Sequence, residues 1–213
     1  MTRNKILILP TAYFPPLHYF AEITASGKLL IEQHETYPKQ TYRNRCYIYS
    51  ANGILPLSIP VERGSFHKVK LRDIKIDYSG KWQREHINAI RSAYNSSAFF
   101  EFYADEVMKP LYLNYKFLID MNMDILHTIF NILEIDIPTA KTASFIKDYG
   151  NNNYKDLRYE PEPGRQMFSH APGYFQVFAS RHGFKAGLSI IDLLFNLGPE
   201  SWSYLKTLNQ DLR

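Results

Sequence analysis

The residues best suited to chemistry lie in one basic, aromatic segment. It contains Lys39, Arg43 and Arg45. Guanidinium and ammonium groups packed this closely suit a diphosphate, which arginine contacts through paired hydrogen bonds. Tyr37, in the same segment, is placed to stack on a base or a sugar ring. Alternation along a strand puts Arg43 and Arg45 on one face. The alternative explanation is a solvated edge strand, on which basic side chains discourage aggregation.

A second candidate is the run Glu32-Gln33-His34-Glu35, which offers an imidazole between two carboxylates near the end of a predicted strand. Such a group can bind a hard metal ion or transfer protons, with Glu35 as a general base. A polar surface turn explains the same residues. None of the 7 histidines has His-x-His or His-x-x-x-His spacing, so the sequence predicts no metal site.

Ser189 and Asp192 stand three residues apart where a helix is predicted to begin. The plain interpretation is a capping pair, in which the hydroxyl accepts from a free amide and the carboxylate lies near the positive helix end. The competing hypothesis makes Asp192 a general base. The single cysteine, Cys46, is interpreted as a small buried hydrophobe.

His18 lies where a first strand gives way to a helix, the place where α/β proteins bind phosphate. The segment bears a partial resemblance to the nucleotidylyltransferases, which carry a His-x-Gly-His pair after an aromatic residue. Phe20 and Ala21 stand where that family has Gly and the second His, so only His18 matches. The sequence contains no P-loop, Gly-x-Ser-x-Gly or Gly-x-Gly-x-x-Gly motif.

The elements that position these residues begin with a strand, a helix and a strand. Ile6-Leu7-Ile8-Leu9 predicts a buried strand, and an apolar stripe that stops at Gly27 predicts a helix. Residues 29–32 predict the next strand, and this order is typical of a parallel pair.

Asn52-Gly53 predicts a hairpin turn between strands over residues 46–50 and 54–61. Pro56 and Pro60 place the second strand at a sheet edge. Alternating isoleucines predict a further strand over Arg72–Asp77.

The apolar period changes from two to nearly four between Lys81 and about Leu133, which predicts three helices. A long loop or lid is expected at 148–173, followed by a helix that ends at Gly198 and a last short helix. We therefore expect one α/β domain over 1–213, with a strand-helix-strand unit and a hairpin in 1–80 and a mainly helical part in 81–213.

Composition and charge narrow the class of protein. Of the 213 residues, 45% are hydrophobic and 22% charged, as in ordinary globular proteins. Residues 39–91 carry eleven Lys or Arg against four Asp or Glu, whereas residues 101–163 carry six against eleven. The basic stretch favours a phosphate-bearing ligand, although packing against the acidic stretch is an alternative, and the offset disfavours nucleic acid. One cysteine and the lack of a long apolar run predict a cytoplasmic protein without a membrane span.

Four blocks of the sequence together resemble the WbqC-like proteins of bacteria. The blocks are ILPTAYFPPLHYFAEI, IEQHETYPKQTYRNRCYI followed by LPLSIPV, WQREHINAIRSAYNSSAFF, and YFQVFASRHGFKAGLSIIDLLFNLGPES. They occur in the family's order along nearly the whole chain, and the stretch from about 141 to 173 matches least. The residues that match the family motif are Tyr13, His18, Tyr19, Tyr37, Lys39, Arg43, Asn44, Arg45, Gln176, Ser189, Asp192 and Asn196.

The resemblance implies a role in bacterial surface polysaccharide and O-antigen synthesis, without a settled reaction. The leading hypothesis is a group transferase, or an accessory enzyme, that binds a sugar nucleotide or another phosphate-bearing small molecule. Asp192 or Glu35 would be its general base. Two alternatives are a non-catalytic interaction protein of the same pathway and a nucleotidylyltransferase-like enzyme that uses His18. No cofactor or oligomeric state is predicted.

Overall fold

A four-stranded parallel sheet forms one side of the protein, in a computed structural model that describes residues 5–62, 69–150, 153–159 and 172–211. The strand order is β5-β2-β1-β6, and every neighbouring pair is parallel. The central strand β1 buries Leu7, Ile8 and Leu9 on both faces, as its unbroken apolar run predicts. The strands are β1 (Ile6–Pro10), β2 (Lys28–Glu32), β5 (Thr139–Lys141) and β6 (Tyr154–Asp156).

Strands β5 and β6 come from the part of the chain that we expected to be mainly helical. Each has three residues and contains a lysine, so neither shows the apolar alternation that marks a strand in a sequence. Strand β6 lies inside the segment predicted to be a loop over 148–173. Residues 151–152 and 160–171 of that loop lie outside the described part of the chain.

Helix α1 (Leu17–Ile23) connects β1 to β2, and all of its residues are buried. It packs against the last helix, α7 (Ser201–Asp211), where the Asn209 amide donates to the Ala21 carbonyl oxygen at 2.8 Å. The predicted strand-helix-strand unit is therefore confirmed, and its helix is covered by the distant end of the chain.

The predicted hairpin is confirmed as β3 (Arg45–Ser50) and β4 (Gly53–Ser58), a separate antiparallel pair. Its turn differs by one position from the expected Asn52-Gly53 turn, because Ser50 pairs with Gly53. Ala51 and Asn52 therefore form the turn, and Gly53 alone has a positive φ, +101°. A type I turn followed by a left-handed glycine gives this geometry.

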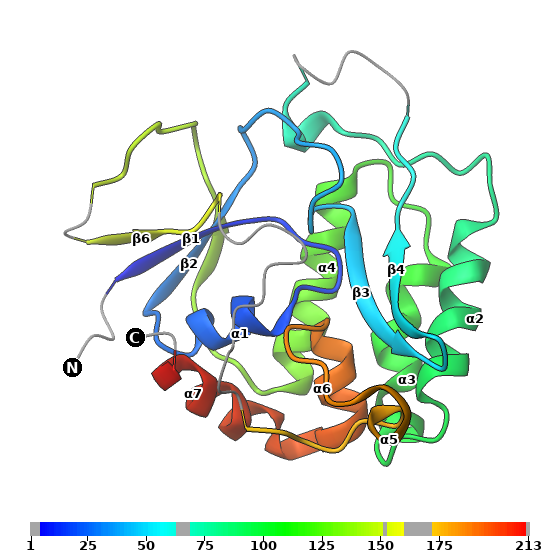
Figure 1. Ribbon diagram of the computed structural model, residues 1–213. Helices are drawn as coiled ribbons and strands as arrows, with labels where there is room; N and C mark the ends of the chain where they lie inside the picture. The colour runs from blue at the N-terminus through cyan, green and yellow to red at the C-terminus, as the bar shows by residue number, and fades with distance from the viewer. Residues whose placement is uncertain (1–4, 63–68, 151–152, 160–171, 212–213) are drawn as a thin grey trace.

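Three helices follow the hairpin, as predicted: α2 (Trp82–Tyr94), α3 (Phe100–Met108) and α4 (Leu118–Ile132). Figure 1 shows α4 between the parallel strands and the hairpin, with α2 and α3 on the hairpin side. Near the end of the chain, α5 (Ala179–His182) and α6 (Ile190–Leu197) precede α7. Short 3-10 turns cover Leu71–Asp73, Lys109–Tyr112 and Gly198–Glu200.

The strand predicted over Arg72–Asp77 is wrong. Ile74 and Ile76 are buried as the alternation requires, but the segment makes only single-residue bridges, from Ile76 to Val61 and from Lys75 to Phe117. A 3-10 turn at Leu71–Asp73 precedes them and leaves too few extended residues for a ladder.

No helix among the described residues is long and apolar enough to cross a membrane.

Gly198 gives a test of the packing between the end of α6 and Phe99, the residue before α3. Its φ is +58°, and a Cβ atom there would lie 2.5 Å from Cδ1 of Phe99. We expect Gly198→Ala to lower the free energy of unfolding by about 2 kcal/mol, because backbone strain and overpacking act together. Urea denaturation measures the change. Gly80→Ala is the matched control, since a Cβ there meets open space. An equally small effect at both glycines would contradict the packing described.

Candidate functional site

The β1–α1 loop is closed to a phosphate group. The amide of Leu17 donates to the Leu188 carbonyl at 3.0 Å, and the hydroxyl of Ser189 donates to the Phe14 carbonyl at 2.8 Å. The amide of Tyr13 is likewise bonded to the carbonyl of Tyr42. Because chain segments already use these groups, the usual phosphate position of α/β proteins is occupied here by the protein itself.

Charged side chains gather instead where β2 and β6 end. The guanidinium group of Arg158 lies 3.1 Å from Oε2 of Glu32 and 2.6 Å from Oδ2 of Asp156. The side chains of Arg158 and Glu32 are fully buried, whereas that of Asp156 is 23% exposed. The sheet order places β6 beside β1 on the side opposite β2, so the strand order reverses here. Ligands of open α/β sheets bind at such a reversal, outside the carboxyl ends of the strands.

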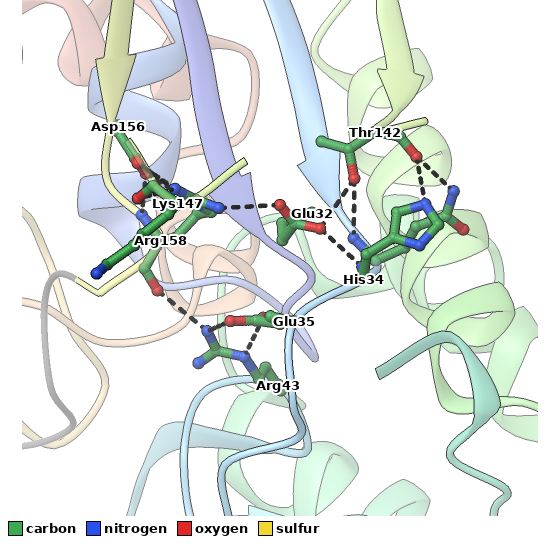
Figure 2. Close-up of polar contacts among 9 residues, drawn as sticks. Glu32, His34, Glu35, Arg43, Thr142, Lys147, Asp156 and Arg158 are labelled. Carbon is green, nitrogen blue, oxygen red and sulfur yellow. Dashed lines mark hydrogen bonds and ion pairs between the residues drawn. The ribbon is translucent and has the colours of Figure 1, made fainter. Parts of the chain in front are cut away.

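A second ion pair lies beside the first (Figure 2). Nε and Nη2 of Arg43 donate to the two carboxylate oxygens of Glu35 at 2.7 and 2.8 Å. Nη2 also donates to the carbonyl oxygen of Arg158 at 3.0 Å, which joins the two pairs. From α4, the amide of Asn122 donates to the Arg43 carbonyl at 2.7 Å. The Glu35 carboxylate is therefore held in one orientation by a forked, nearly fully buried partner.

His34 and Thr142 complete the polar cluster from the other side. The Thr142 hydroxyl, after β5, donates to Oε1 of Glu32 at 2.9 Å. The backbone amide of His34 donates to the same oxygen at 2.7 Å, and its imidazole Nε2 lies 3.0 Å from the Thr142 carbonyl. His34 is thus turned away from the carboxylates. Among the described residues, no group of three or more His, Cys, Asp or Glu is placed to hold a metal ion.

The cluster has one more carboxylate than guanidinium groups, because Glu32, Glu35 and Asp156 face Arg43 and Arg158. Burial raises the pKa of Glu35, although the hydrogen bond and charge of Arg43 oppose this shift. A carboxylate with a raised pKa accepts a proton more readily than an ordinary exposed carboxylate does.

The basic segment is only partly as predicted. Strand β3 begins at Arg45, so Arg43 lies in the preceding turn, and the expected alternation of the two on one strand face is wrong. Arg45 donates from Nε to the Ser58 hydroxyl at 2.8 Å, and the Asn44 amide donates to the Ile59 carbonyl at 2.9 Å. Lys39 is exposed.

The ring of Tyr37 is buried, at 4% exposure, and burial raises its pKa to about 12. A base could stack on this ring only if the residues that cover it moved.

Asp192 belongs to a separate cluster. Its fully buried carboxylate accepts hydrogen bonds from Tyr94, Tyr174 and Gln176, at 3.0, 2.5 and 2.8 Å. Burial raises its pKa to about 6 despite these three donors. Ser189 is the N-cap of α6 and accepts from the amide two residues later, as the capping interpretation predicts. Asp192 lies in the first turn of α6, as that interpretation also expects, and its side chain in addition fixes the segment at 174–176 to the core.

Other predicted residues also lie in the interior. The Tyr13 hydroxyl is 2.8 Å from Nδ1 of His86, and the Asn196 amide donates to the Asp192 carbonyl at 2.8 Å. The His18 ring is 3% exposed and packs edge-on against Tyr42. Cys46 is fully buried, in agreement with its interpretation as a small hydrophobe. A ligand would reach these groups only after the covering segments moved.

Sequence reasoning selected Glu35 and Arg43 separately, by residue type, and missed Asp156, Arg158, Thr142 and Asn122. One signal was available for Thr142, Asp156 and Arg158, which stand at or just after strand ends. Because β5 and β6 were not predicted as strands, the residues at their ends were not identified as site candidates.

Comparisons with known proteins agree with the resemblance seen in the sequence. The chain matches the WbqC-like protein family over residues 11–173. It is 28% identical over 233 residues to the uncharacterized protein Rv1507c of Mycobacterium tuberculosis (strain ATCC 25618 / H37Rv), an alignment that covers 97% of this chain and 100% of that protein. No solved structure matches.

Removal of the Arg158 charge tests the buried pair. We expect Arg158→Ala to lower the free energy of unfolding by about 3–5 kcal/mol, because Glu32 would remain buried without its partner. Lys141→Ala is the control. It breaks an ion pair to Asp120 whose side chains are 37% and 48% exposed, and should cost less than about 1 kcal/mol. Chemical denaturation of both variants measures the contrast. Equal losses would show that Arg158 does not neutralise a buried charge.

His18 predicts a pH dependence of stability. Burial lowers its pKa to about 3, and its Nε2 atom has no hydrogen-bond partner among the described residues. The unfolded chain binds a proton near pH 6.5, so stability from neutral His18 is present above that pH and is lost as the pH falls toward 3. As the pH falls from 7 to 4, we expect the free energy of unfolding of His18→Phe to rise by about 3 kcal/mol relative to that of the wild type.

Denaturation curves at both pH values measure this change. His127→Phe, at an exposed position of α4, is the control and should leave the pH profile as in the wild type. A constant difference between His18→Phe and the wild type at the two pH values would contradict the prediction.

Proposed function

The chain belongs to the WbqC-like protein family, and from this premise we propose that it is a group transferase that acts on a sugar nucleotide in bacterial surface polysaccharide synthesis. The observation that carries the proposal is the Glu35–Arg43 pair at the carboxyl edge of the parallel sheet, beside a segment that contains the exposed Lys39 and the half-buried Arg45. Such an edge is where α/β enzymes bind nucleotides.

The diphosphate is assigned to the outer basic residues, Lys39 and Arg45. Arg43 is a poor candidate, because its Nε and Nη2 atoms already donate to Glu35 and Arg158. The buried cluster also has an excess of carboxylate, which repels phosphate. Lys39 is exposed, and Arg45 is half-buried with its Nε bonded to the neutral Ser58 hydroxyl, so both attract the phosphates at a lower cost than Arg43 would.

Glu35 is assigned as the general base. During transfer, the attacking hydroxyl or amine would form a bond to the transferred group, lose its proton to a carboxylate oxygen of Glu35, and displace the leaving group. The raised pKa of Glu35 favours this proton uptake. Arg43 would orient the carboxylate. Asp192 is the weaker candidate for the base, because its carboxylate is fully buried and already accepts three hydrogen bonds.

Exposed aromatic side chains favour a second candidate, a non-catalytic interaction protein. Phe102 on α3 is 76% exposed, and Phe175 is 66% exposed. Large exposed rings are frequent anchors in protein interfaces. Purification of a stoichiometric protein partner, together with no binding of any small molecule, would favour this candidate over the transferase.

A thermal-shift screen tests the proposed function. The panel contains sugar nucleotides, free nucleoside diphosphates and triphosphates, with and without Mg²⁺. A ligand at 100 times its dissociation constant adds about 2.7 kcal/mol of stability, which raises the melting temperature measurably. We expect one sugar nucleotide to give a selective shift, and the double variant Lys39→Ala, Arg45→Ala to lose most of it.

Lys109→Ala, at an exposed lysine after α3, is a control that also removes a surface cation, and it should keep the shift. Retained affinity in the double variant would overturn the phosphate assignment, and no shift with any nucleotide would overturn the transferase.

A further inference from the structure

Three aromatic rings surround the Arg158 guanidinium group. Its central carbon lies 5.0 Å from the ring centre of Phe145, 4.9 Å from that of Tyr149 and 5.5 Å from that of Tyr159. We call Phe145, Tyr149 and Tyr159 the aromatic platform. The positive charge attracts the electron-rich faces of these rings, and desolvation strengthens that attraction. The platform is therefore anchored to a buried group that is itself fixed by Glu32 and Asp156.

The contact with Arg158 leaves much of the aromatic platform exposed to solvent. Phe145 is 43% exposed and Tyr159 is 66% exposed, which is unusual for rings tied to a buried charge. Ile146, next to Phe145, is also 44% exposed. Exposed apolar surface of this kind, held rigid, costs little entropy when a planar ligand stacks on it.

The position of the platform matters as much as its composition. Arg158 and Tyr159 follow β6 closely, and Phe145 and Tyr149 lie between β5 and β6, so the platform belongs to the carboxyl edge of the sheet. Asp156, the only partly exposed carboxylate of the three in the cluster, lies at the same place. A planar ring system that carries hydroxyl groups on a neighbouring sugar matches this pairing of exposed rings with a partly exposed carboxylate.

We propose that the aromatic platform binds the base of a nucleotide, which stacks on Phe145 and Tyr159 while a ribose hydroxyl donates to Asp156. This inference rests on the proposed function and deepens it, because it places the nucleoside half of the sugar nucleotide. The base would lie over β6, and the diphosphate would extend toward the basic segment that follows Glu35.

Stacking explains the platform better than a purely structural role does. The Arg158 side chain is already fully buried, so the exposed faces of Phe145 and Tyr159 are not needed to shield its charge. A base has two flat faces, and contact on one of them is enough to gain stacking energy. Every base can stack in this way, so stacking does not select one base. Selectivity for one base over another must then come from groups other than these rings.

The test measures affinity and contact separately. Isothermal titration with uridine 5′-monophosphate, adenosine 5′-monophosphate and the free nucleosides compares the wild type with Phe145→Ala and Tyr159→Ala. Each substitution should weaken binding of a nucleoside or nucleotide about tenfold, and leave affinity for inorganic pyrophosphate unchanged. Tyr159→Trp keeps a stacking ring and should retain affinity. Phe102→Ala, at an exposed ring on α3, is the matched control and should bind as the wild type does.

Saturation-transfer NMR on the same complexes gives an independent readout, since base protons in contact with the platform should receive more saturation than sugar protons. Unchanged nucleotide affinity in both alanine variants, or stronger saturation of the sugar, would overturn the platform and leave the transferase standing. Free nucleosides that bind to the platform in a protein that gives no shift with sugar nucleotides would uphold the platform and refute the transferase. No binding of any nucleoside or nucleotide would refute both.

Discussion

A fully buried ion pair, Arg158 with Glu32, governs the arrangement of the carboxyl edge of the sheet. Both side chains have no exposed surface, so each charge depends on the other and on the hydrogen bonds around it. The pair reaches from the end of β6 to the end of β2, across the central strand β1. Thr142, His34 and Arg43 each form a hydrogen bond to a residue of this pair.

The same contacts fix the two shortest strands of the sheet. Strands β5 and β6 have three residues each, and they bring few apolar side chains to the core. Thr142 after β5 and Arg158 after β6 both bond to Glu32, which fixes the two outer strands to one carboxylate. The residues assigned to a ligand site and the residues that close the sheet are therefore neighbours, and substitutions at one will affect the other.

Periodicity in the sequence predicted much of the fold. The α1 unit, the hairpin and helices α2 to α4 all have apolar side chains at regular spacing, so local patterns were enough. The two short strands have no such pattern and form only because distant groups hold their ends. In the site, Glu35 and Arg43 were predicted as functional residues from their residue types. Their pairing could not be foreseen, because it depends on Arg158 and Asn122, each more than 70 residues away in sequence. The hydrogen bonds to Asp192 could not be foreseen for the same reason, since its three donors come from other segments.

The cover of α1 by the far end of the chain has a consequence for how the protein is made. Residues 16 and 189 form a bridge, and Asn209 bonds to Ala21 across 188 positions. Ribosomes release the amino terminus first, so the fully apolar strand β1 and the buried helix α1 emerge long before their partners exist. Contacts this distant are also slow to form after synthesis. The core side chains of residues 6–23 therefore remain in contact with water or with a chaperone until residues 189–209 have been synthesised.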